Sequence, residues 1–196
     1  MTRSALRGRS AGVMACGLFG ALWANSSLSF GPSTLRNVGY VVVGLITCMQ
    51  LWGSFDLRRQ SRQITVANDP PSSVQKRTTR LFFAIFAAEF ILIFAAANVL
   101  ASQHATQYLM PVIAMVVGLH FYPLASLFRA RQFYVTASVM TLAGLVGVLA
   151  LSAHVTSNPV NVVVDAICAA TLWLTGLYSW RSTMQLAHVD HRQGMK

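Results

Sequence analysis

Glu89 and His120 are the residues of this sequence whose types and surroundings best suit chemistry inside a membrane. Each lies within a long apolar run, where a charged side chain costs at least about 2.5–3.5 kcal/mol to insert. A carboxyl group and an imidazole held together in a low-dielectric medium can share a proton, as an ion pair or as a neutral pair. The pair therefore suggests a proton or cation site, and the alternative is a structural bond that joins two helices.

Counting from the arginines that flank the apolar runs predicts that these residues lie at one depth. Glu89 lies nine residues after one arginine and His120 nine residues before another, which places both about 13 Å from the same boundary at the helical rise. Gln50, eight residues before the next arginine of its own run, lies at about 12 Å. We therefore predict a midplane site of Glu89, His120 and Gln50, although Gln50 by itself could simply join helices.

The apolar run that carries His120 contains two prolines. Pro123 has no N–H to donate to the carbonyl of Leu119, so that carbonyl is left free beside His120. Pro111 offers a second break near the other end of the run. Kinked helices with freed carbonyls surround many transport sites, but they are also common in other membrane helices.

A second polar layer lies farther from the arginines, and we interpret it as an outer vestibule. Asp165 precedes Arg181 by sixteen residues, which gives a depth of about 24 Å. Asn25 and Asn98 lie at similar depths, and Asn161 lies just beyond. The alternative for Asp165 is a position within reach of interfacial water, where a charge costs less.

The elements that must position these residues are six apolar runs, each long enough to cross a hydrocarbon core of about 30 Å as an α-helix. None shows the alternating pattern of a membrane β-barrel strand. We expect an all-α, polytopic membrane protein with three antiparallel hairpins in one transmembrane domain over residues 1–196, and an uncleaved first helix. The expected spans are residues 11–30, 38–55, 81–101, 108–128, 133–153 and 159–180, with a long loop at 56–80.

The basic residues predict the orientation, because lysine and arginine concentrate in cytoplasmic segments. Of the 15 lysines and arginines, all but Arg36 fall in the two tails, the 56–80 loop or the 129–132 link. We therefore expect both chain ends in the cytoplasm. The formal net charge of +10 is explained by these flanking positions, so it does not indicate a nucleic-acid partner.

Composition limits the remaining classes of function. The chain is 55% hydrophobic and only 10% charged, which points to lipid as its solvent. Its three cysteines, Cys16, Cys48 and Cys168, are widely spaced within apolar runs and suggest neither disulfides nor a metal site. No nucleotide, haem or metalloprotease motif is present, so we expect no cofactor and no metal.

The stretch from Gly118 to Leu124, followed by Leu127-Phe128-Arg129 and Phe133-Tyr134, resembles an uncharacterised family of small bacterial membrane proteins. These proteins carry a Gly-x-His-x-x-Pro-like fourth helix after a basic entry to the third. The resemblance covers roughly the third to fifth spans. It implies a multi-pass protein of a bacterial inner membrane and carries no established activity.

Three functions fit these observations. The first is a transporter or channel for a small solute or ion, coupled to protons through Glu89 and His120. The second is a membrane-embedded enzyme acting on a lipid or apolar substrate, although no nucleophile stands out. The third is a non-catalytic accessory or assembly protein. Membrane lipids are the expected partners, and stripes of small residues would allow a homo-oligomer.

Overall fold

The computed structural model describes residues 3–29, 33–63 and 73–193, and these residues form six long α-helices with no strand among them. All six contain a stretch long and apolar enough to cross a membrane, which indicates a multi-pass membrane protein. The helices are α1 (Arg3–Ser29), α2 (Ser33–Gln63), α3 (Ser73–Ser102), α4 (Leu109–Phe128), α5 (Arg131–Ser152) and α6 (Ser157–Gln193), with a 3₁₀ turn, η1 (Thr106–Tyr108), before α4.

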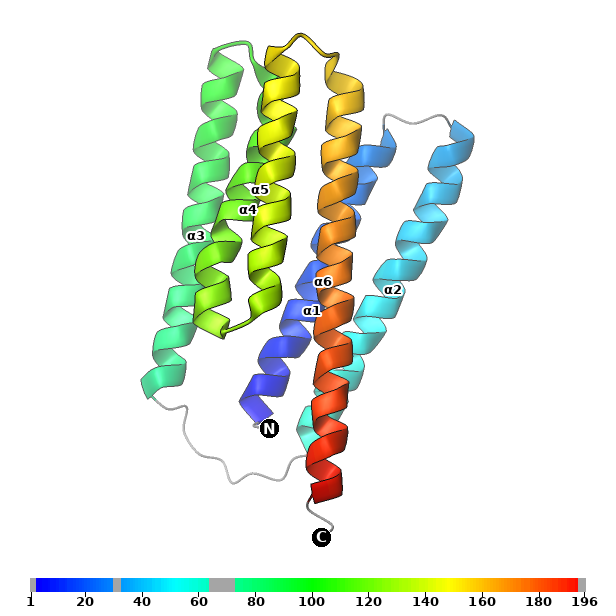
Figure 1. The fold of residues 1–196 in the computed structure, drawn as a ribbon, viewed down its shortest axis with the longest axis vertical. Coiled ribbons are helices and arrows are strands. Elements are labelled where there is room, and N and C mark those ends of the chain that lie inside the picture. The colour runs from blue at the N-terminus through cyan, green and yellow to red at the C-terminus, as the bar shows by residue number, and fades with distance from the viewer. Residues whose placement is uncertain (1–2, 30–32, 64–72, 194–196) are drawn as a thin grey trace.

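The helices run up and down along the long axis of the molecule, and both termini lie at the same end (Figure 1). Neighbours in space follow the order α3, α4, α5, α6, α1, α2, with further contacts of α6 to α2 and to α4. Helix α3 therefore packs on α4 and the adjoining turn, at the edge of the bundle. Helix α6 touches four other helices, which makes it the central element.

Helices α2 and α3 continue beyond their apolar runs into the segment that carries Arg58 to Arg80, so the predicted 56–80 loop is wrong in extent. Helix α2 continues to Gln63 and α3 begins at Ser73, which leaves residues 64–72 between them. Arginine and lysine are good helix formers, and a helix needs no lipid to keep its backbone hydrogen bonds. The hydropathy pattern therefore predicts where each helix leaves the lipid, but it does not predict where the helix itself ends.

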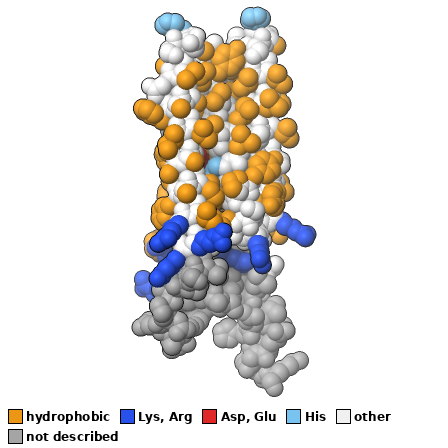
Figure 2. Space-filling view, turned by 90° about the vertical axis from the view of Figure 1, so that its left-hand side faces the viewer, with side chains coloured by type: hydrophobic (Ala, Val, Ile, Leu, Met, Phe, Trp, Pro, Cys, Tyr) orange, Lys and Arg blue, Asp and Glu red, His pale blue; other side chains and the backbone are white. Residues whose placement is uncertain are grey.

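The two ends of the bundle differ in their polar side chains (Figure 2). On the face shown, lysine and arginine gather toward one end, which we call the basic end, and histidines mark the opposite end, which we call the histidine end. His104 and His154 lie there with φ of 52° and 62°, each as the left-handed residue that closes a helix. The backbone amide of the following residue donates to the carbonyl oxygen of Leu100 in the first case and of Ala150 in the second, as in a Schellman motif.

Close helix packing depends on glycines at the seams between helices. A methyl group at Gly118 would lie 2.6 Å from the backbone nitrogen of Thr141, so α4 and α5 approach closely there. A methyl group at Gly176 of α6 would lie 2.5 Å from Oε1 of Gln50 and 3.0 Å from Cβ of Cys16, which brings α1, α2 and α6 together. Such small-residue contacts are how membrane helices gain packing energy.

Candidate intramembrane acid sites

The structure brings Glu89 of α3 and His120 of α4 together. Nδ1 of His120 lies 3.3 Å from Oε1 of Glu89, and the two side chains are 12% and 8% exposed. The distance is that of an ion pair, but the contact lacks the angles of a hydrogen bond, since Nδ1 has no hydrogen-bond partner among the described residues. A small rotation of either side chain would allow a proton to lie between the two atoms.

Helices α3 and α4 position this pair because they form an antiparallel hairpin whose facing sides are otherwise apolar. Residues one turn from Glu89 on α3 are Ile85 and Ile93, and those one turn from His120 on α4 are Val116 and Leu124. Figure 2 shows acidic and histidine atoms about midway along this face, within a mostly hydrophobic surface. The pair therefore lies in a low-dielectric seam at the edge of the bundle.

Aromatic side chains fill the seam between this pair and the basic end. Phe82 stacks on Phe86 with ring centroids 6.0 Å apart, and Phe86 meets Phe90 edge-on at 4.9 Å. Phe82 also contacts Phe128 of α4 at 6.0 Å. Phe82, Phe86 and Phe128 therefore place apolar rings between Glu89 and the basic end.

Gln50 does not join Glu89 and His120, so the predicted three-residue site requires correction. Gln50 is fully buried where α2 meets α1 and α6, and its Nε2 donates to the carbonyl oxygen of Trp173 at 2.8 Å. Equal depth on different helices does not imply proximity, because α2 and α3 lie at opposite edges of the helix order. Gln50 therefore acts here as a contact between helices.

The structure does not bring together the four residues of the predicted outer vestibule. Asp165 is fully buried and Asn161, one turn earlier on α6, is 9% exposed. Asn25 of α1 is exposed, and Asn98 is exposed on α3, where its Nδ2 donates to Phe94 of the same helix at 2.7 Å. Only Asp165 and Asn161 of the four are therefore buried together on one helix.

Ser26 is the partner of Asp165 that the sequence reasoning missed. Its Oγ donates to Oδ2 of Asp165 at 2.6 Å, and the neighbouring Ser27 Oγ donates to the carbonyl of Val162 at 3.0 Å. The signal was available, since Asn25-Ser26-Ser27 is a polar stretch near the end of an apolar run. Helices α1 and α6 are thus joined by hydroxyl groups at the depth of Asp165.

The two prolines of α4 differ in position. Pro123 lies inside α4, as expected, three residues after His120. Pro111 lies in the first turn of α4, where a missing N–H breaks no intrahelical hydrogen bond, so the predicted second break is wrong. Instead Pro111 is buried and packs against Gly147 of α5.

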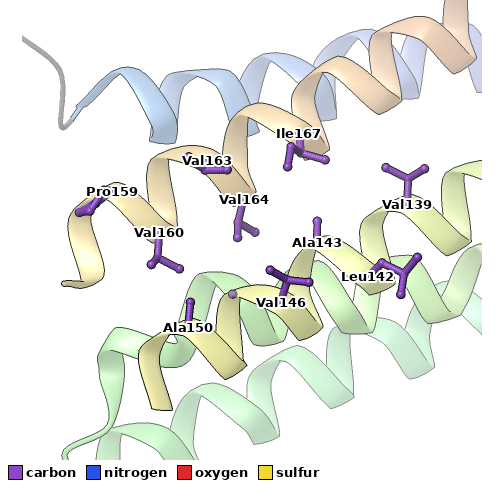
Figure 3. A pocket seen from close by; sticks show the side chains of 11 residues that line it. Val139, Leu142, Ala143, Val146, Ala150, Pro159, Val160, Val163, Val164 and Ile167 are labelled. Atoms are coloured by element: carbon purple, nitrogen blue, oxygen red, sulfur yellow. The ribbon is translucent and has the colours of Figure 1, made fainter. Parts of the chain in front are cut away.

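A groove on the surface of the helices includes neither acid. It measures about 540 Å³, lies between α5 and α6 and is lined by apolar side chains such as Val139, Val146 and Val163 (Figure 3). An apolar groove on the outside of a membrane protein is a surface that lipid chains can fill. The polar chemistry therefore lies in the helix seams.

Comparison with known proteins identifies a family. A model of a family of unknown function, DUF7010, matches residues 75–176, a segment that includes Glu89, His120, Asn161 and Asp165. No curated protein and no solved structure matches the chain. The matched segment makes up more than half of the sequence, and the chain therefore belongs to this family of unknown function.

Proposed function

We propose that the protein is a small membrane transporter or channel that conducts protons through Glu89 and His120. The observation that carries this proposal is the 3.3 Å contact between the Glu89 carboxylate and the His120 imidazole, whose side chains are 8% and 12% exposed, on two apolar helices. Intramembrane acids are expensive to retain and recur in proton relays. The pair also lies within the segment that matches the family.

The chemistry of the pair suits a proton relay. A carboxylate and a neutral imidazole can each accept a proton, and a proton held by one faces an acceptor on the other. Freed of its N–H partner by Pro123, the carbonyl of Leu119 is a further acceptor on α4 next to His120. The stacked rings of Phe82 and Phe86 would act as an apolar barrier to protons and water between Glu89 and the basic end.

Proton flux into liposomes tests this proposal. We expect purified protein, reconstituted with a trapped pH dye and driven by a potassium diffusion potential, to pass protons faster than protein-free liposomes. Glu89→Gln should abolish this flux, because an amide cannot bind the proton, while its similar shape leaves the fold intact. The matched control is Asp56→Asn, an acid near the basic end whose Oδ2 contacts Gln60, which should retain the flux. Wild-type flux equal to that of empty liposomes, or undiminished flux in Glu89→Gln, would overturn the proposal.

A second candidate is a non-catalytic assembly protein, in which the pair holds α3 to the rest of the bundle. It is favoured by the edge position of α3, whose main contacts are to α4 and η1, and by the apolar residues on both sides of the pair. This candidate predicts no proton flux in the wild type. It also predicts that His120→Leu loosens α3, measured as faster amide hydrogen exchange along residues 81–101.

A further inference from the structure

The seam between α1 and α6 holds a second acid whose surroundings differ from those of Glu89. Asp165 is fully buried, and Ser26 donates to its Oδ2 at 2.6 Å. Its other oxygen, Oδ1, has no hydrogen-bond partner among the described residues. Half of a buried carboxylate is therefore left without a donor, which is costly unless something positive occupies the space.

Asn161 presents a second acceptor of the same kind. Its Oδ1 is buried and has no partner in the described part of the chain. Asn161 and Asp165 are four residues apart on α6, so their side chains lie one above the other on the same face of the helix. Two unpartnered oxygens therefore lie one turn apart on the same face of α6, and Ser26 of α1 reaches the other oxygen of Asp165, Oδ2, from the neighbouring helix.

The charge of this region also lacks a partner. Asp165 forms no salt bridge with a lysine or arginine whose side chain the structure describes. A water molecule could donate to both free oxygens but would leave the negative charge unbalanced in a low-dielectric seam. A bound cation satisfies the free acceptors and the charge together.

The oxygens available indicate the class of cation. Carboxylate, amide and hydroxyl oxygens are hard ligands, and a single carboxylate balances a single positive charge. The described residues contain no cluster of three or more His, Cys, Asp or Glu side chains, which transition metals or a multiply charged site would favour. We propose that Asp165, Asn161 and Ser26 form a binding site for a monovalent alkali cation, with Na⁺ as its probe. This inference does not depend on the proposed function of Glu89 and His120.

Thermal unfolding in different salts tests the site. Purified protein in detergent is titrated with NaCl against choline chloride at constant ionic strength, and unfolding is followed by tryptophan fluorescence. Because a ligand that binds the folded state raises its stability by mass action, we expect the midpoint temperature to rise with the logarithm of Na⁺ concentration. Asp165→Asn should remove this rise.

Further variants keep the test decisive if Asp165→Asn does not fold. Ser26→Ala and Asn161→Ala each remove one oxygen and should shift the titration to higher Na⁺, while Asn98→Ala, an exposed asparagine on α3, should leave it unchanged. Binding of radioactive ²²Na⁺ to the wild type gives a readout that does not require unfolding. A midpoint that is the same in NaCl and choline chloride, or that responds to pH alone, would overturn the proposal.

Discussion

The two buried acids lie in seams of opposite character. Glu89 lies at the edge of the bundle, between α3 and α4, and meets an imidazole that can take up or release a proton. Asp165 lies where α6 packs on α1, and meets a hydroxyl group that stays neutral. Similar side chains in similar lipid therefore have different needs: Glu89 can be neutralised within its own pair, whereas Asp165 needs a cation or proton from elsewhere.

The seams also differ in how their helices are held. Helices α1, α2 and α6 are joined by buried hydrogen bonds, including those of Ser10 with Ser54 and of Gln50 with Trp173, and by close glycine contacts. Between residues 81 and 101, α3 carries two polar side chains, Glu89 and Asn98, of which Asn98 bonds its own helix. A rigid seam suits a fixed ion site, and a mostly apolar seam around the Glu89–His120 contact suits a site that can open.

The largest effect is expected from Gly176→Val, which places a larger side chain where α1, α2 and α6 pack closely. A side chain there meets Gln50 and Cys16, and overpacking of a close seam costs about 3 kcal/mol. Gly44→Val is the matched control, because a methyl group at Gly44 meets nothing within 4 Å. The free energy of unfolding, measured by titration with a denaturing detergent, checks both variants. Equal losses would show that α1, α2 and α6 are not closely packed at Gly176.

A smaller loss is expected from Ser26→Ala. Removal of the hydroxyl leaves the Asp165 carboxylate without its described donor, and a hydrogen bond to a charged group contributes roughly 1.5 kcal/mol or more. The same unfolding titration measures the loss, with Ser102→Ala as the control, since Ser102 is exposed and bonds only the backbone of Val99 among described partners. A Ser26→Ala protein as stable as the wild type would contradict the described contact with Asp165.

A double-mutant cycle measures the coupling of Glu89 with His120. Glu89→Gln, His120→Leu and the double variant should give a coupling free energy of about 1 kcal/mol, because polar contacts between membrane helices are individually modest. A value near zero would mean that the two side chains are close without interacting, and would weaken both candidate functions of the pair.

The smallest effect is expected from Asn98→Leu. Asn98 is exposed on α3 and bonds Phe94 one turn away, so its replacement by an apolar residue should change the free energy of unfolding by less than about 0.5 kcal/mol. A large loss of unfolding free energy, or a change in its dependence on Na⁺, would support the predicted role of Asn98 in an outer vestibule.

Much of the fold could be predicted because lipid imposes a simple rule on composition. The six apolar runs, their order and the placement of Glu89 and His120 at one level all follow from hydropathy and the helical rise. The helix ends near Gln63 and Ser73 could not be predicted this way, since helices continue into water. The separation of Gln50 from Glu89 depends on which helices are neighbours, and no local pattern records that.

The Ser26–Asp165 contact shows the same limit in the site. Both residues stand out as polar within apolar runs, yet they are 139 positions apart, and only the packing of α1 on α6 brings them together. The sequence also contains a repeated pattern that marks the helix ends at the histidine end. Ser-x-His occurs at residues 102–104 and 152–154, and both histidines close a helix in the left-handed conformation.

Glu89 and Asp165 are costly to bury, and therefore informative about function, only if lipid surrounds these helices. Single cysteines at Arg36 and Lys76, in a background with Cys48→Ala, can be labelled with a membrane-impermeant maleimide from either side of sealed vesicles. If the six helices cross the membrane, the two positions are labelled from opposite sides. Labelling of both from the same side would contradict the six spans, and with them the interpretation of both acid sites.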